Sequence, residues 1–281
     1  MSIKIQVEDA KFLAENGRHL GALTNLMLAV AASSRKTFPK GKTKSLKDPS
    51  KKMGDSEAFT LFIGGRIRKI LFGDFGGSET GNSGISVNFK NKQYDIAFIL
   101  YKFYRCELVH EGELPEDIEF SPPRESMNLG MSNNGVSVSV SCGNTMVLDY
   151  GWIDLLVESV VSARCNGKTF GIQHFEMHPA TDISDDGICK IITEKYNTSP
   201  GRFHILKEAA YHIQPSIVIQ SNDEELRTEF SKLVYSGIIN RGAITGLSSH
   251  NLTDRSGNIT DIGIEIIRYI SVEYELVEIT S

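Results

Sequence analysis

An arginine and a histidine stand five residues apart at the end of an apolar segment. Arg105 and His110 belong to the stretch ILYKFYRCELVHEGELPED, which starts apolar and ends in an acidic turn with glycine and proline. Arginine is always charged and offers phosphate oxygens a planar fork of donors, and an imidazole exchanges a proton near neutral pH. These residue types suit phosphodiester chemistry. The alternative is a structural role, because cations near a helix C-terminus also interact favourably with the helix dipole.

The helix that would carry these two residues runs roughly from Lys92 to His110. On an ideal α-helix, residues five apart are separated by about 140° around the axis. We therefore expect the Arg105 and His110 side chains to diverge and to flank a groove.

Two further helices are predicted before this one. Residues 8–34 carry apolar side chains at steps of three and four, the period of one long amphipathic helix. A second helix starts at Asp55 or Ser56, either of which would cap it. Gly64 and Gly65 lie inside it and indicate close packing or a kink, because glycine weakens a helix. Basic side chains follow at Arg66, Arg68 and Lys69.

The segment between those two helices, RKTFPKGKTKSLKDPSKK, is strongly basic. Two prolines and a glycine break any helical period in it, and Asp48 is its one acid. One interpretation is a solvated mobile loop, and the other is an arm that grips phosphates. Its basic residues are Arg35, Lys36, Lys40, Lys42, Lys44, Lys47, Lys51 and Lys52.

The hydrophobic period changes after the motif helix. The stretch GVSVSVS alternates valine with serine, as in a strand, so residues 136–148 are expected to form a two-stranded ribbon. A helix from Trp152 to Ala163 follows, and the polar stretch RCNGKT marks a boundary. The sequence thus predicts a mainly α domain with a small β ribbon over residues 1–170. A smaller α/β domain is expected over residues 171–281.

The C-terminal part resembles a winged-helix module. A helix, a glycine turn, a polar stretch and a helix capped by Thr260 follow one another, with NLTDRSGNIT as the wing. Its basic residues are thinly spread and offset by acids, which favours protein contacts or weak nucleic-acid binding. Short helices are expected around Asp185–Tyr196, Phe203–Tyr211 and Glu224–Tyr235.

The stretch LYKFYRCELVHEGELP resembles the signature of the HEPN superfamily (higher eukaryotes and prokaryotes nucleotide-binding). Members carry an arginine, four to six residues, and then a histidine at the end of a core helix. Here four residues separate Arg105 from His110. The order of a long helix, a basic loop, a second helix and the motif helix is similar too. The resemblance covers about residues 8–164 and implies a HEPN-like helical bundle.

The resemblance also implies an activity, that of a metal-independent endoribonuclease acting as a toxin or phage-defence effector. Arg105 would stabilise the charge that develops when the RNA 2′-hydroxyl attacks the adjacent phosphate, and His110 would move the proton. In the family the site is usually shared across a homodimer, each protomer contributing one arginine and one histidine. RNA and an antitoxin or regulatory protein are the implied partners.

Four more residues are candidates for contact with RNA. Tyr101 and Tyr104 could stack on a base, or pack in the dimer seam or the core, and Arg66 and Lys69 add positive charge. Cys106 stands where active members often carry Asn or Asp. A second function therefore stays open, a non-catalytic RNA- or nucleotide-binding dimer. A third is a regulator or adaptor led by the C-terminal module.

Neither a metal nor a cofactor is predicted. His174, Glu176 and His178 would share one face of a strand, but no further ligand stands nearby, which favours hydrogen-bonded histidines. The four cysteines form no Cys-x-x-Cys motif, which indicates reduced thiols in the cytoplasm. The net charge of −5 means that RNA must be held by a local basic patch. We expect neither an export signal nor a membrane span.

Overall fold

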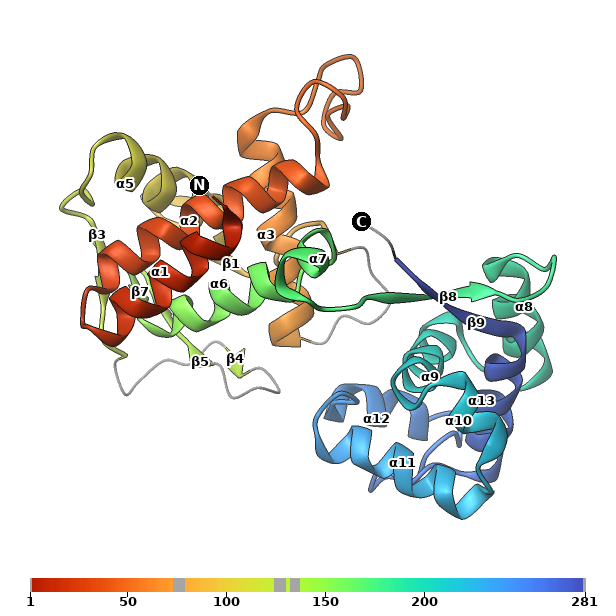
Figure 1. Cartoon of the computed structure of the whole chain (residues 1–281). Coiled ribbons are helices and arrows are strands. Elements are labelled where there is room, and N and C mark those ends of the chain that lie inside the picture. Colours follow the sequence, from red (N-terminus) through yellow and green to blue (C-terminus); the bar gives the residue numbers. More distant parts are fainter. Residues whose placement is uncertain (1, 73–78, 124–129, 132–136, 280–281) are drawn as a thin grey trace. The chain divides into compact units, whose positions relative to one another are not determined.

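The structure, a computed structural model, describes residues 2–72, 79–123, 130–131 and 137–279. The chain divides into two compact units, the first ending at Gln173 and the second beginning at His174 (Figure 1). Both units consist mostly of helices with small β-sheets, which confirms the mainly α class. Among the described residues, no helix combines the length and the apolar character that crossing a bilayer would need.

Two packed helices, not one, open the first unit. α1 (Ile3–Glu15) and α2 (His19–Thr37) are separated by a turn, so the prediction of one helix over 8–34 is wrong. The Asn16 side chain donates to the Phe12 carbonyl, and Gly17 has a φ of 73°. Glycine adopts this left-handed conformation at little cost, and it ends the helix there. The sequence signal for this break was the Asn-Gly pair.

The third helix packs against a loop of its own unit. α3 (Asp55–Phe72) begins where the sequence predicts a helix start. A Cβ atom on Gly64 would clash with the Gly81 carbonyl oxygen, and one on Gly65 with the Glu79 carbonyl oxygen. Only glycine lets backbone come this close, so the prediction of close packing is confirmed.

The motif helix starts later than predicted. Lys92–Asp95 form strand β2, which pairs antiparallel with β1 (Ser86–Phe89) through a turn with positive φ at Lys90 and Asn91. The Asp95 side chain then caps the helix by accepting from the Ala97 amide. Helical structure continues to His110 through α4 (Ile96–Ile99), the π-helical η1 (Leu100–Arg105) and α5 (Cys106–His110).

A small mixed sheet follows instead of a simple ribbon. β7 (Met146–Asp149) pairs antiparallel with β6 (Val140–Ser141), as predicted, and parallel with β3 (Ile118–Ser121), which was not predicted. Val136 lies outside the described residues. The unit also contains β4 (Gly130–Met131) paired with β5 (Ser137–Val138), then α6 (Gly151–Val161), the 3₁₀ turn η2 (Arg164–Asn166) and α7 (Gly167–Phe170).

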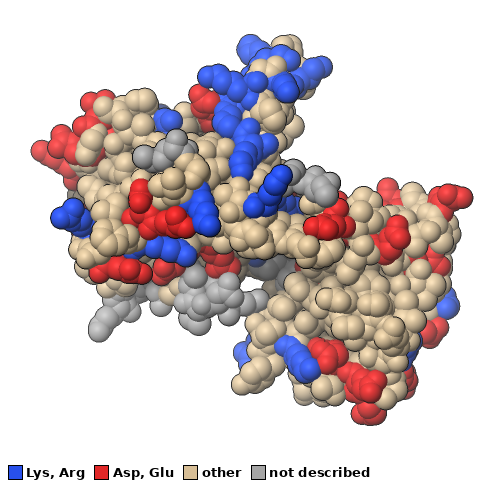
Figure 2. All heavy atoms as spheres, viewed as in Figure 1, with Lys and Arg blue, Asp and Glu red and all other residues tan. Residues whose placement is uncertain are grey.

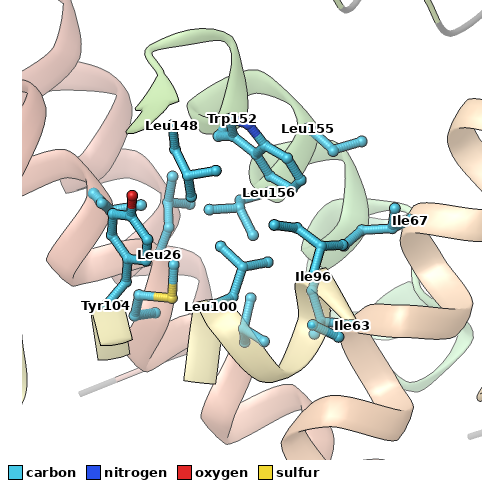
Figure 3. Close-up of a cluster of buried hydrophobic side chains, with 14 of the residues drawn as sticks. Leu26, Ile63, Ile67, Ile96, Leu100, Tyr104, Leu148, Trp152, Leu155 and Leu156 are labelled. Carbon is cyan, nitrogen blue, oxygen red and sulfur yellow. The ribbon is translucent and has the colours of Figure 1, made fainter. Parts of the chain in front are cut away.

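One continuous apolar core holds the motif helix in place. Figure 3 shows side chains of the motif helix meeting those of α2, α3, β7 and α6. Trp152 is fully buried and donates its indole N–H to the Ser139 carbonyl. Burial of a large apolar side chain contributes roughly 1.5–3 kcal/mol, so this core fixes the helix. The labelled members are Leu26, Ile63, Ile67, Ile96, Leu100, Tyr104, Leu148, Trp152, Leu155 and Leu156.

The second unit has its own apolar core. Its first and last strands, β8 (Phe175–Pro179) and β9 (Tyr274–Glu278), pair antiparallel. Thr260 caps the last helix by accepting from the Gly263 amide, as predicted, and Thr253 and Ile259 form a single bridge within the segment predicted as a wing. Its helices are α8 (Asp185–Lys195), α9 (Pro200–Ile213), α10 (Pro215–Gln220), α11 (Asp223–Tyr235), α12 (Arg241–Ser248) and α13 (Asp261–Glu273).

Candidate functional site

Arg105 and His110 lie together within one chain. Arg105 Nη1 is 3.4 Å from His110 Nε2, so the prediction that the two side chains diverge is wrong. That prediction assumed ideal α-helical geometry, from which the π-helical turn ending at Arg105 departs. The long arginine side chain also spans the remaining separation between the two positions around the helix.

The contact fixes the roles of the two groups. A guanidinium has donors and no acceptor, so in this contact Arg105 donates and the imidazole Nε2 accepts. His110 is exposed at the end of α5, whereas Arg105 is half-buried. His110 Nε2 therefore faces a permanent cation.

Arg105 lies over an aromatic ring and forms no ion pair with the described residues. Its Cζ lies 5.7 Å from the centre of the Tyr101 ring, which in turn packs on Phe59 at 5.3 Å. Burial raises the pKa of the Tyr101 phenol. Within the described parts of the chain, no carboxylate lies within ion-pair distance of Arg105, and its buried Nε has no hydrogen-bond partner. Its charge therefore remains available to an anion.

A second arginine, which the sequence analysis did not link to the site, lies nearby. Arg35, in the last turn of α2, donates from Nε to Asp55 Oδ1 at 2.8 Å. This hydrogen bond lowers the pKa of Asp55, and the charges of Lys40 and Arg105 lower it further. Arg105 is thus within electrostatic reach of the first residue of α3. No local sequence pattern joins residues 35, 55 and 105.

Tyr104 belongs to the core. Its side chain is fully buried, and its hydroxyl donates to the Glu119 carbonyl at 2.9 Å. Burial raises the pKa of its phenol strongly. A base cannot reach this ring, so Tyr104 does not bind substrate and the alternative of core packing is correct.

Arg66 and Lys69 are bound to a carboxylate. Arg66 is 2% exposed; its Nη1 lies 2.7 Å from Glu79 Oε1, and its Nη2 donates to the Ser162 hydroxyl at 2.5 Å. Lys69 Nζ lies 3.6 Å from the same carboxylate, and Arg164 Nε 3.7 Å. Burial lowers the pKa of Arg66 while Glu79 opposes that change. Arg66 therefore has a structural role, which corrects its assignment to RNA binding, and Lys69 shares its carboxylate.

The other candidate residues do not form a site. His178 Nε2 lies 3.2 Å from Glu176 on β8, a hydrogen-bonded histidine as expected. Across the residues that the structure describes, no group of His, Cys, Asp and Glu side chains could hold a metal ion. Cys106 is half-buried beside Arg105.

The comparisons with known proteins bear on the first unit. The profile of the Rv1289 family matches residues 2–178, more than half of the chain and nearly all of the unit that carries Arg105 and His110. No curated protein matches the chain, and no solved structure does.

Proposed function

The chain belongs to the Rv1289 family, and we propose that it is a cytoplasmic, metal-independent endoribonuclease. The observation that carries the proposal is the contact of Arg105 Nη1 with His110 Nε2 at the exposed end of a helix. Arg105 lacks an acidic partner among the described residues, so its charge is available to a phosphate. The HEPN-like arginine–histidine motif supports the same assignment.

The two groups have complementary roles in this reaction. Arg105 donates to the non-bridging phosphate oxygens and stabilises the negative charge that grows as the 2′-hydroxyl attacks phosphorus. Once the phosphate has engaged the guanidinium, His110 Nε2 accepts the hydroxyl proton. The products are a 2′,3′-cyclic phosphate and a free 5′-hydroxyl.

A homodimer is part of the proposal. A second copy would bring another Arg105 and His110 to the same phosphate, so that one histidine removes a proton while the other protonates the leaving oxygen. A toxin or phage-defence role, held in check by an antitoxin protein, fits such an activity.

The test compares wild-type protein with His110→Ala on a labelled RNA in the presence of chelator. We expect wild type to cut the RNA without metal, and the variant to lose about 10²–10⁴-fold in rate. His178→Ala, which removes an exposed histidine of the second unit, is the matched control and should cut like wild type. Undiminished cleavage by His110→Ala would contradict the assignment.

A second function is a non-catalytic RNA- or nucleotide-binding dimer. The observation that favours it is that Arg105 already donates to Nε2, the nitrogen a general base needs free. In this case wild type retards RNA without shortening it, and Arg105→Ala loses the retention. A native gel that shows retention and a denaturing gel that shows cleavage of the same labelled RNA therefore separate the two functions.

A further inference from the structure

We propose that residues 38–54, which we call the basic arm, hold the RNA backbone on one side of the Arg105–His110 contact. The proposal rests on the function proposed above and adds to it the way a long substrate is held. The arm links α2 to α3 and projects from the first unit (Figure 1). Figure 2 shows lysine and arginine side chains gathered over this projection. Its lysines are Lys40, Lys42, Lys44, Lys47, Lys51 and Lys52, all exposed.

Backbone hydrogen bonds give the arm a defined structure. Lys44 and Lys52 form an antiparallel bridge. Flanking it, the Ser45 amide donates to the Lys51 carbonyl at 3.0 Å, and the Met53 amide to the Thr43 carbonyl at 3.0 Å. Two side chains of the arm itself, Ser45 and Met53, are buried. These contacts close the arm into a hairpin that carries the exposed lysines.

The tip of the arm is hydrogen-bonded to a side chain of α3. Glu57 Oε1 accepts from the amides of Leu46 at 2.8 Å and Lys47 at 3.2 Å. Burial alone would raise the pKa of Glu57, but hydrogen bonds from Ser45 and these amides lower it. The carboxylate that fixes the arm is thus kept ionised, and its oxygen bonds backbone amides of the arm.

The base of the arm lies beside the candidate site. Arg35 precedes it and Asp55 follows it, and their ion pair closes the arm at its base. Asp55 is also the carboxyl whose pKa responds to Arg105 and to Lys40, a lysine of the arm. Arg105 and the first lysine of the arm thus both act on the carboxyl that closes the arm, so a strand of RNA whose phosphate lies at Arg105 can continue toward the arm.

Most lysines of the arm form no ion pair with the described residues. Asp48, its one acid, forms an ion pair with Lys51 at 2.9 Å. Among the described residues, no carboxylate lies within ion-pair distance of the arm's other lysines: Lys40, Lys42, Lys44, Lys47 and Lys52. Lys44 stands directly opposite Lys52, and like charges in that position destabilise a hairpin. A polyanion would relieve this repulsion.

Single-stranded RNA fits this surface better than a membrane does. Leu46 is exposed, but it is a single apolar side chain, and a membrane-bound segment buries a larger apolar face. A chain of phosphates instead meets several lysines at once and releases bound counterions. The position beside Arg105 adds a site for one further phosphate.

The test measures binding of a fluorescent 2′-O-methyl oligoribonucleotide, which cannot be cut, to the full chain at several salt concentrations. The arm variant is Lys42→Gln/Lys44→Gln/Lys47→Gln. The control variant, Lys4→Gln/Lys11→Gln/Lys190→Gln, removes the same charge from exposed lysines of α1 and α8. We expect the arm variant alone to bind about tenfold or more weakly, with a salt slope shallower by about 2, since each phosphate contact on a single strand adds about 0.7.

Melting temperatures separate a binding role from a structural one. Because Lys44 and Lys52 repel each other, the arm variant should melt no lower than wild type while it loses affinity. Equal RNA binding by the arm and control variants overturns the proposal. So does wild-type protein that binds phosphatidylserine vesicles and not RNA. If wild type binds through the arm but never cuts RNA, the proposed endoribonuclease fails while the arm's role stands.

Discussion

Arg66 and Arg105 lie in the same unit and meet opposite surroundings. Arg66 is buried between α3 and α6, its terminal nitrogens bound by Glu79 and Ser162. Arg105 lies half-buried near a helix end, with a tyrosine ring and a histidine as neighbours and no acid among the described residues within ion-pair distance. One arginine is neutralised by the fold, and the other is not.

The difference shows which cation is available to a ligand. Taking a charge out of water costs several kcal/mol unless a partner compensates it, so a buried arginine needs its carboxylate. A partly exposed arginine keeps much of its hydration and can remain unpaired at low cost. The sequence analysis assigned Arg105 to catalysis and Arg66 to RNA binding, and the structure separates the two arginines by burial and partner.

The largest expected effect is on stability, at Arg66. Arg66→Ala leaves Glu79 without its closest partner in a buried setting, which we expect to lower the free energy of unfolding by about 3–5 kcal/mol. Arg105→Ala should lower it by less than about 1 kcal/mol. Trp152, the only tryptophan, lies in the core of this unit, so its fluorescence during urea denaturation reports both values. Equal losses would erase the distinction between the two arginines.

The next effect is on activity, at Arg105. If the endoribonuclease proposal holds, Arg105→Ala should slow cleavage about 10²–10³-fold, the usual effect of removing one donor that stabilises developing negative charge. Arg105→Lys keeps the charge without the planar fork and should recover part of the loss. Single-turnover cleavage of a labelled RNA measures all three proteins. A lysine variant as slow as the alanine variant would mean that geometry, not charge, sets the rate.

Local patterns in the sequence predicted local structure well. The Thr260 cap and the helix start at Asp55 each depend on a few neighbouring residues, and each is found in the structure. The glycine pair inside that helix also predicted close packing, although not its partner, the loop at Glu79–Gly81. The break at Gly17 was equally local, and a strong apolar period on both sides concealed it.

Contacts across loops could not be predicted in this way. Glu79 reaches Arg66 from beyond a glycine-rich stretch, and Asp55 reaches Arg35 across the whole basic arm. Such partners are chosen by the packing of the helices, which no spacing in the sequence encodes. The candidate site was therefore found from its motif, whereas its Arg35–Asp55 neighbours and the burial of Tyr104 required the structure.

A smaller effect is expected from the ring beneath Arg105. Tyr101→Leu removes the cation–π contact, worth about 0.5–1 kcal/mol at a partly exposed site, and should weaken RNA binding by about two- to fivefold. Tyr101→Phe keeps an aromatic face and should bind nearly like wild type. Anisotropy titrations with an uncleavable RNA measure both. Equal losses in the two variants would point to the phenol hydroxyl instead of the ring.

The smallest effect is expected at Asp55. Its exposed ion pair with Arg35 is intermediate between the buried ion pair of Arg66 and the unpaired charge of Arg105. Asp55→Asn should cost less than about 1 kcal/mol of stability, as exposed pairs do, and should strengthen RNA binding, because it removes a negative charge within reach of Arg105. The folded protein lowers the pKa of Asp55, chiefly through the Arg35 hydrogen bond. Its contribution is therefore fully present above about pH 4, the range of an unfolded aspartate, and is lost as the pH falls through the lowered value.

Urea denaturation of wild type and Asp55→Asn at neutral and at acidic pH tests the direction of this pH dependence. The difference in unfolding free energy between the two proteins should shrink toward zero as the pH falls, because a protonated Asp55 no longer attracts Arg35. Glu8→Gln, which removes an exposed acid from α1, is the matched control and should leave RNA binding unchanged. A difference that grew on acidification would mean that Asp55 is destabilised by its surroundings. In that case the charge of Arg35, like that of Arg105, would be available to an anionic ligand.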